Sequence, residues 1–225
     1  MVQRGIEMEW IAATNNAHKL EEMRRILGRM GHTVLSQKEA GIALEPEETG
    51  ATFAENAAIK ARAIANASGK AAIADDSGLC VNALNGAPGV YSARFCGHHG
   101  DDDANNDKLL QEMQSVPKAQ RGARFVSAIC VVFPDGTEAV WEGECPGSIA
   151  FEPQGTNGFG YDPLFIPVFV AKDLENKEQF TYAQLTAQQK DAISHRGAAL
   201  MKMEQELPNL LNQKTNQKEQ TNVNE

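Results

Sequence analysis

Cysteine is scarce in this sequence, basic residues are not in excess, and no long apolar run is present. The four cysteines form no C-x-x-C pair, which argues against a zinc site of the usual spacing. A chain of 225 residues does not need disulfides to be stable, so we expect free thiols. The formal net charge of −9 argues against a nucleic-acid backbone or an anionic membrane as the main partner, because both favour basic surfaces. A small anionic ligand remains compatible with it, since such a ligand needs only a local basic pocket.

Signals for membrane insertion or secretion are also missing. Nowhere do about 18 apolar residues follow one another, and the N-terminus has no long apolar segment. We therefore expect a soluble, cytoplasmic protein. Apolar residues make up 42% of the chain, which is enough for a substantial core. We expect one domain over residues 9–207, a short N-terminal extension over 1–8, and a disordered polar tail over 208–225.

Helical and extended patterns alternate in the first half of the chain, and a hairpin signal follows in the second. Pro134-Asp135-Gly136 separates two apolar segments and is typical of a turn between paired strands. We expect the sequence Asp75–Gly78 to end the strand before it, and residues 147–151 are a candidate for further pairing. This order predicts an α/β protein with a mixed sheet. The expected strands are 10–13, 33–36, 71–74, 124–133 and 138–144, and the expected helices are 17–30, 52–67, 101–114 and 187–207.

Two acidic clusters are candidates for metal binding. Asp75 and Asp76 follow a short apolar segment, and open α/β sheets bind ligands at the carboxyl ends of their strands. Side chains alternate along extended backbone, so only one of the two can easily face a given cleft. A loop supplies Glu45, Glu47 and Glu48. Magnesium takes one or two carboxylates together with substrate phosphates, so one aspartate and one glutamate would suffice. Chemistry alone does not choose between Glu47 and Glu48, and either cluster could instead be an ordinary turn or a solvated surface.

The segment Thr14–Lys19 is a candidate phosphate site. It follows a strand and opens a helix, where free N–H groups and the helix dipole attract phosphate, and Lys19 adds a positive charge. An ordinary capped helix is the alternative. The segment Thr14–Lys19 differs from the glycine-rich phosphate-binding loop of the common nucleotide hydrolases.

Two further motifs could recognise a base. In Gly158–Pro163 two aromatic residues flank a glycine and lead to an acid, so the loop could stack on a base and read its edge. Ser194–Gly197 contains a His-Arg pair that offers donors to carbonyl or phosphate oxygens. The alternatives are an aromatic turn packed on the core and a surface pair.

Taken together and in order, these motifs are similar to those of the inosine triphosphate pyrophosphatase family, specifically the bacterial dITP/XTP pyrophosphatases. The similarity runs from about Trp10 to Leu200. The matching segments are Thr14–Lys19, Phe53–Ala61, Ala74–Leu79, Gly86–Arg94, Gly158–Pro163 and Ser194–Leu200. One departure is the stretch 168–180, which is longer than in typical bacterial members.

The resemblance implies a long mixed β-sheet flanked by helices, with two lobes enclosing a nucleotide cleft, and a homodimer. It implies hydrolysis of deaminated purine nucleoside triphosphates (ITP, dITP, XTP) to the monophosphate and pyrophosphate, with Mg²⁺ as cofactor. It assigns the general base and a metal ligand to Asp76, and a second metal ligand to Glu48. The substrate-binding residues that it implies are Thr14, Asn15, Asn16, Ala17, His18, Lys19, Lys60, Ser77, Phe159, Gly160, Tyr161, Asp162, Lys190, His195 and Arg196.

Two other functions are weighed against this one. A metal-dependent phosphatase acting on another phosphorylated metabolite would release orthophosphate. A nucleotide-binding module without turnover would not need Asp76. The sequence does not rank ITP, dITP and XTP.

Overall fold

The computed structural model describes residues 7–168 and 180–222, so most of the unusually long stretch 168–180 lies outside the described residues. The strands are β1 (Glu9–Ala12), β2 (Thr33–Ser36), β3 (Ala72–Val81), β4 (Gly122–Val132), β5 (Glu138–Ile149) and β6 (Phe165–Pro167). The α-helices are α1 (Ala17–Arg29), α2 (Phe53–Ser68), α3 (Asp102–Glu112), α4 (Ala187–Ile193) and α5 (His195–Asn222). Short 3₁₀ helices include η2 (Gly89–Arg94) and η5 (Tyr182–Gln184).

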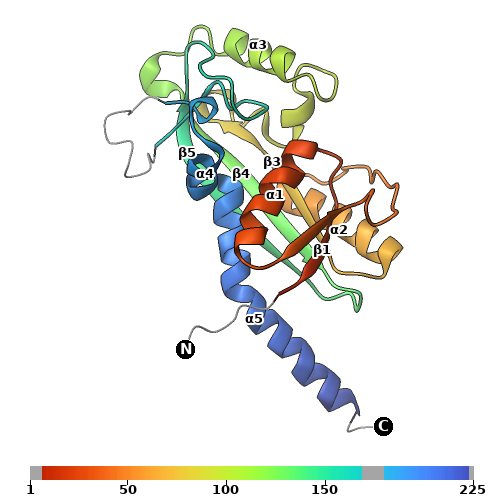
Figure 1. The fold of residues 1–225 in the computed structure, drawn as a ribbon. Helices are drawn as coiled ribbons and strands as arrows, with labels where there is room; N and C mark the ends of the chain where they lie inside the picture. The colour runs from red at the N-terminus through yellow and green to blue at the C-terminus, as the bar shows by residue number, and fades with distance from the viewer. Residues whose placement is uncertain (1–6, 169–179, 223–225) are drawn as a thin grey trace, which may run out of the picture.

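The strands form one mixed sheet in the order β2-β1-β3-β4-β5-β6 (Figure 1). β1 pairs in parallel with β2 and β3, whereas β3, β4, β5 and β6 pair antiparallel. The predicted α/β fold with a mixed sheet between helices is confirmed. Long antiparallel pairing between β4 and β5 places the Pro134–Gly136 turn at one end of the sheet, as the hairpin signal predicted.

Side chains on the two faces of the sheet form separate cores. Along β3, Ile73 faces the cluster that contains α1 and α5 residues, whereas Ala72 and Ala74 face the cluster that contains α2 residues. The same alternation occurs in β4, where Ile129 and Cys130 belong to opposite clusters. α1 and α5 therefore cover one face and α2 covers the other. A third apolar cluster, with residues of α3 and η5, fills the far end of the molecule.

The expectation that Asp75–Gly78 ends a strand is wrong. β3 continues through these residues to Val81, and each of them is paired with β4. Aspartate and glycine are depleted in strands, but pairing with a long neighbouring strand overrides that local preference. Gly78 is required here, because a Cβ atom would collide with the Gly89 carbonyl and the Ser92 hydroxyl of η2. The strand that ends here is β1, at Ala12. Beyond Ile73, β3 therefore has no pairing with β1 along that edge.

The C-terminal region also departs from expectation. The single helix predicted for 187–207 is two helices, because Ser194 is extended between α4 and α5. The tail expected to be disordered from Pro208 onward is described as helix to Asn222, and Leu210 and Leu211 pack against the α1/α5 core. β5 joins the expected strand at 138–144 with the candidate pairing at 147–151 as far as Ile149. No helix among the described residues is long and apolar enough to span a membrane.

Candidate active site

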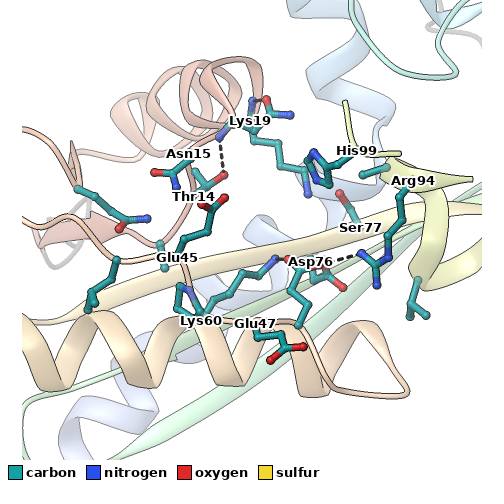
Figure 2. A pocket seen from close by; sticks show the side chains of 18 residues that line it. Thr14, Asn15, Lys19, Glu45, Glu47, Lys60, Asp76, Ser77, Arg94 and His99 are labelled. Carbon is teal, nitrogen blue, oxygen red and sulfur yellow. Dashed lines mark hydrogen bonds and ion pairs between the residues drawn. The ribbon is translucent and has the colours of Figure 1, made fainter. Parts of the chain in front are cut away.

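The first functional feature is a cavity of about 430 Å³ at the carboxyl end of β1, which we name the acidic cavity. The start of α1, the loop 44–48, α2, β3 and η2 surround it (Figure 2). Side chains of both charges converge here from elements far apart in the sequence. Among the predicted site residues, those that line it are Thr14, Asn15, Asn16, Lys19, Glu48, Lys60, Asp76 and Ser77.

One wall of the acidic cavity is the start of α1. Asn16 caps the helix, with its side-chain oxygen accepting from the Lys19 N–H at 3.0 Å. The Thr14 hydroxyl accepts from the Asn16 N–H at 3.1 Å, which fixes the approach of the chain to the helix. Ala17 is the first residue of α1. The N-terminal N–H groups and the dipole of such a helix favour anionic groups, so this wall suits phosphate.

The opposite wall is an ionic cluster around Lys60 of α2. The Lys60 ammonium donates to Glu48 at 2.6 Å, to Asp76 at 3.0 Å and to the Asp75 carbonyl at 3.0 Å. Burial raises the pKa of Asp76, and the opposing effect of Lys60 does not fully offset it. Burial also acts to raise the pKa of Glu48, but Lys60, Lys19 and Arg94 lower it below its ordinary value. Asp76 is thus a stronger base than an ordinary aspartate, whereas Glu48 is a weaker base than an ordinary glutamate.

The two adjacent aspartates face opposite sides of the sheet, as the alternation of side chains predicts. Asp76 faces α2 and the acidic cavity. Asp75 faces α1 and α5, where it is 1% exposed and accepts from Lys19 and Arg196. Burial acts to raise the Asp75 pKa, but Arg196 and Lys19 hold it well below its ordinary value. Asp76 is therefore the aspartate able to meet a ligand, and Asp75 organises the cations behind it.

The acidic cavity has suitable donors for a hard divalent cation. The single ammonium of Lys60 holds Glu48 and Asp76 together, so their oxygens already lie around one positive charge. Glu47 lines the same cavity, but Glu48 is the glutamate that contacts Lys60. Within residues 7–168 and 180–222, no three His, Cys, Asp or Glu side chains form a closed metal cage. Two carboxylates completed by substrate phosphates are the arrangement that Mg²⁺ prefers.

A second cavity, of about 540 Å³, lies on the other side of α1, and we name it the aromatic cavity. It is lined by residues of α1, the loop 156–159, η5 and α4. Three predicted site residues reach it, namely His18, Phe159 and Lys190. The Lys190 ammonium lies 4.7 Å from the centre of the Phe159 ring, and the His18 ring stacks on Phe159.

The loop that carries Phe159 is held by a buried carboxylate. Asp162 accepts from the Phe159 N–H at 3.0 Å and from Lys190 at 2.6 Å. Gly158 has a φ of +78°, and a Cβ atom there would collide with the Asp162 carboxylate. Gly160 does not line either cavity; its N–H donates to Asp102 at 2.7 Å. Asp162 thus fixes the position of the aromatic ring above Lys190.

The interpretation of Tyr161 as a second stacking residue is wrong. Its ring is 3% exposed and belongs to the apolar cluster at the far end of the molecule. Its hydroxyl donates to the Ser92 carbonyl at 2.9 Å. The side chain therefore anchors the loop to η2 and presents no face to the aromatic cavity.

His195 and Arg196 line neither cavity, although the resemblance places them against the base. His195 is 4% exposed and stacks on Phe125, with ring centres 4.7 Å apart. Burial and the neighbouring Arg196 lower its pKa well below the ordinary value, so the ring is neutral. Arg196 is 1% exposed and donates to Asp75, Ser77 and Glu22. Among the described residues, His195 Nδ1 and Arg196 Nε have no hydrogen-bond partner.

A buried chain of alternating charges connects the two cavities. Lys19 pairs with Asp75, which pairs with Arg196; Glu22 then links Arg196 to Lys190, which holds Asp162. Burial acts to raise the pKa of Glu22, but Arg196 and Lys190 bring it down to about 2. Sequence reasoning missed Glu22, as well as Asn56, which donates to Asp76 at 3.3 Å. Their spacing offers one signal, since Glu22 lies three residues after Lys19 and Asn56 four before Lys60, on the same helix faces.

Arg94 of η2 is a further residue of the site, and no role was predicted for it. It lines the acidic cavity, with Nη1 3.8 Å from a Glu48 oxygen. The site therefore combines a helix start, three cationic side chains and four carboxylates at one end with a stacked aromatic ring at the other. Such a pair of sites can hold an elongated ligand that carries several negative charges and one flat ring system.

Comparisons with known proteins agree with this architecture. The model of the Ham1 family matches residues 10–206. A protein of Corynebacterium efficiens named dITP/XTP pyrophosphatase is 52% identical over 196 residues, which cover 86% of this chain and 94% of that protein. A solved HAM1 protein from Coxiella burnetii has a TM-score of 0.76 and 39% identity, covering 90% of this chain and 99% of that one. A solved nucleoside-triphosphatase / dITP/XTP pyrophosphatase from Mycobacterium abscessus has a TM-score of 0.67 and 46% identity, with 88% and 98% covered. The resemblance seen in the motifs is confirmed, and the chain belongs to the Ham1 family.

Proposed function

We propose that this protein hydrolyses deaminated purine nucleoside triphosphates, namely ITP, dITP and XTP, to the monophosphate and pyrophosphate. The observation that carries the proposal is the arrangement of the two cavities. Phosphate-binding groups and carboxylates line one, a stacking ring lines the other, and both adjoin the first turn of α1. The relatives named dITP/XTP pyrophosphatase support the same activity.

The triphosphate would lie in the acidic cavity. The N–H groups at the start of α1 and the ammonium groups of Lys19 and Lys60 offset its charge. Glu48 and Asp76 would hold Mg²⁺, which neutralises charge on the phosphates as the bond breaks. Lys60 pairs with both carboxylates in the free protein, so its ammonium is already placed beside them to contact phosphate oxygens.

Asp76 would act as the general base. It would orient a water molecule toward the α-phosphorus and accept its proton, with pyrophosphate leaving from the other side. A carboxylate is a weak base at its ordinary pKa, and burial makes Asp76 a stronger one. Asn56 holds its other oxygen at 3.3 Å and so limits rotation of the carboxylate.

The base would enter the aromatic cavity and stack on Phe159. Lys190 has three N–H donors, and Glu22 and Asp162 occupy two of them. The third is left to donate to the six-oxo group of a deaminated purine. Adenine carries an amino group at that position and would leave the donor unpaired, which can cost orders of magnitude in rate. His195 and Arg196 lie behind this wall, and Arg196 holds Glu22, which in turn positions Lys190.

Three further properties rest on the resemblance and on composition. We propose that residues 9–207 fold as one domain, to whose core the continuation of α5 adds Leu210 and Leu211. We also propose that the protein forms a homodimer and that it acts in the cytoplasm on free nucleotides. Nucleic acid and membranes are not proposed as partners, since the chain has a formal net charge of −9.

The function is tested with a panel of nucleoside triphosphates in the presence of Mg²⁺. The release of pyrophosphate and of orthophosphate is measured for each substrate. We expect pyrophosphate from ITP, dITP and XTP and little product from ATP. Glu48→Gln should raise the Mg²⁺ concentration needed for half-maximal rate. Release of orthophosphate would instead identify a phosphatase of another substrate, and nucleotide binding without any turnover would identify a binding module.

A further inference from the structure

His18 belongs by sequence to the phosphate-binding segment, but the fold places it elsewhere. Thr14, Asn15, Asn16 and Lys19 line the acidic cavity, whereas His18 lines the aromatic cavity. The cause is helical geometry. Successive residues of a helix point about 100° apart, so His18 and Lys19 in the first turn of α1 leave the helix in different directions.

The imidazole of His18 lies against the ring that is expected to bind the base. The centres of the His18 and Phe159 rings are 5.2 Å apart, and the ring planes are inclined by only 11°. No hydrogen bond or ion pair holds the His18 side chain to another described residue, and the residue is exposed. By contrast, the backbone of Phe159 is tied to the buried Asp162. One ring of this pair is therefore fixed and the other is free to change rotamer.

We propose that His18 and Phe159 form the two walls of a clamp into which the purine base inserts. This inference rests on the proposed function and adds a base-binding residue to it. An inserted ring needs van der Waals contact on both faces, so the outer rings must stand roughly 7–8 Å apart. The two rings must therefore separate by roughly 2–3 Å from the observed stack. Rotation of the His18 side chain about its two torsions provides this movement without a change in α1.

The clamp explains how an exposed loop can hold a flat ligand firmly. Stacking on one face leaves the other face of the base in water, whereas a second ring removes that face from water as well. In the free protein, the His18 ring covers the face of Phe159 that the base will use, which keeps apolar surface out of water. The alternative is that His18 contacts phosphate, as we propose for its sequence neighbours.

The test compares a ligand that has a base with one that lacks it. Inosine monophosphate and inorganic triphosphate are measured as competitive inhibitors of ITP hydrolysis by the full chain with Mg²⁺. The variants are His18→Ala, which removes the ring, and His18→Phe, which keeps a ring but no imidazole. Asn15→Ala is the control in the acidic cavity. Thermal melting verifies that each variant is folded.

With a clamp, His18→Ala weakens inosine monophosphate binding about 5- to 150-fold, the range expected for loss of one stacking partner. It raises KM for ITP more than it lowers kcat. His18→Phe stays within about threefold of the original protein, because stacking is retained. Inorganic triphosphate binds equally well to both His18 variants and more weakly to Asn15→Ala.

Two results would overturn the clamp. One is unchanged binding of inosine monophosphate to His18→Ala. The other is a loss of inorganic triphosphate binding in both His18 variants, which would place the imidazole on phosphate. Failure of the proposed function has a different signature, since the unsubstituted protein would then release no pyrophosphate from ITP.

Discussion

Replacing each of the two neighbouring aspartates of β3 by asparagine should have a different effect. Asp75→Asn should lower the stability of the fold, whereas Asp76→Asn should lower the rate of hydrolysis. Asp75→Asn removes the fully buried carboxylate that pairs with Lys19 at 2.9 Å, at the wall of the acidic cavity, and with the buried Arg196 at 3.0 Å. Removing one partner of a buried ion pair leaves uncompensated charge and costs about 3–5 kcal/mol. For a chain of this size that corresponds to a fall in melting temperature of roughly 6–20 °C.

Asp76→Asn should keep the fold and lose the reaction. Burial raises the Asp76 pKa above its ordinary value of 3.8, so its ionised form opposes folding at neutral pH. Replacing the carboxylate by an amide therefore costs no stability, and Glu48 still neutralises Lys60. Turnover of ITP should nevertheless drop at least about 100-fold, because the general base is gone.

The assay compares the original protein with Asp75→Asn and Asp76→Asn. Thermal unfolding is measured without metal or nucleotide, and pyrophosphate release from ITP is measured at steady state. The pH dependence adds a second readout for Asp75. Its pKa is held well below 3.8 in the folded state, so its stabilisation is complete above that pH and is lost as the pH falls below it. The gap in melting temperature between the original protein and Asp75→Asn should thus be constant from pH 7 to pH 5 and narrow in stronger acid. A stable Asp75→Asn protein, or an Asp76→Asn protein with near-normal turnover, would refute the assignment of the two roles.

Two other predictions concern the aromatic cavity and the C-terminal helix. Phe159→Ala should weaken binding of every purine nucleotide by a similar factor, worth about 1–3 kcal/mol, because stacking does not distinguish among purines. Competition binding with inosine and adenosine monophosphates measures this, and a changed ratio between them would mean that Phe159 also reads the base edge. Deleting residues 208–225 should lower the melting temperature by several degrees, on the order of 1–2 kcal/mol, because Leu210 and Leu211 are lost from the core. Deleting only 213–225 keeps both leucines and should leave the melting curve unchanged; equal losses from the two truncations would show that the leucines contribute nothing.

Local sequence patterns were enough to predict most elements of this fold. Asn15 and Asn16 both offer a side-chain cap for the start of α1, and the structure uses Asn16; the β4–β5 hairpin follows from the turn at 134–136. The motifs also singled out Glu48, Lys60 and Asp76, which the structure does bring together. Such signals are local, because a cap, a turn or an alternation of apolar residues acts within a few positions of the chain.

Where side chains meet was decided by the tertiary structure. β3 runs through its two aspartates only because β4 pairs with it along its whole length. A His-Arg pair such as His195-Arg196 is usually found on the surface, but α5 carries Arg196 into the interior, where Asp75 and Glu22 balance its charge. His18 lies next to Lys19 in the chain, yet the turn of α1 sends it to the other cavity. Each of these outcomes depends on partners more than 40 residues away or on the rotation of a helix, so no short window of sequence contains it.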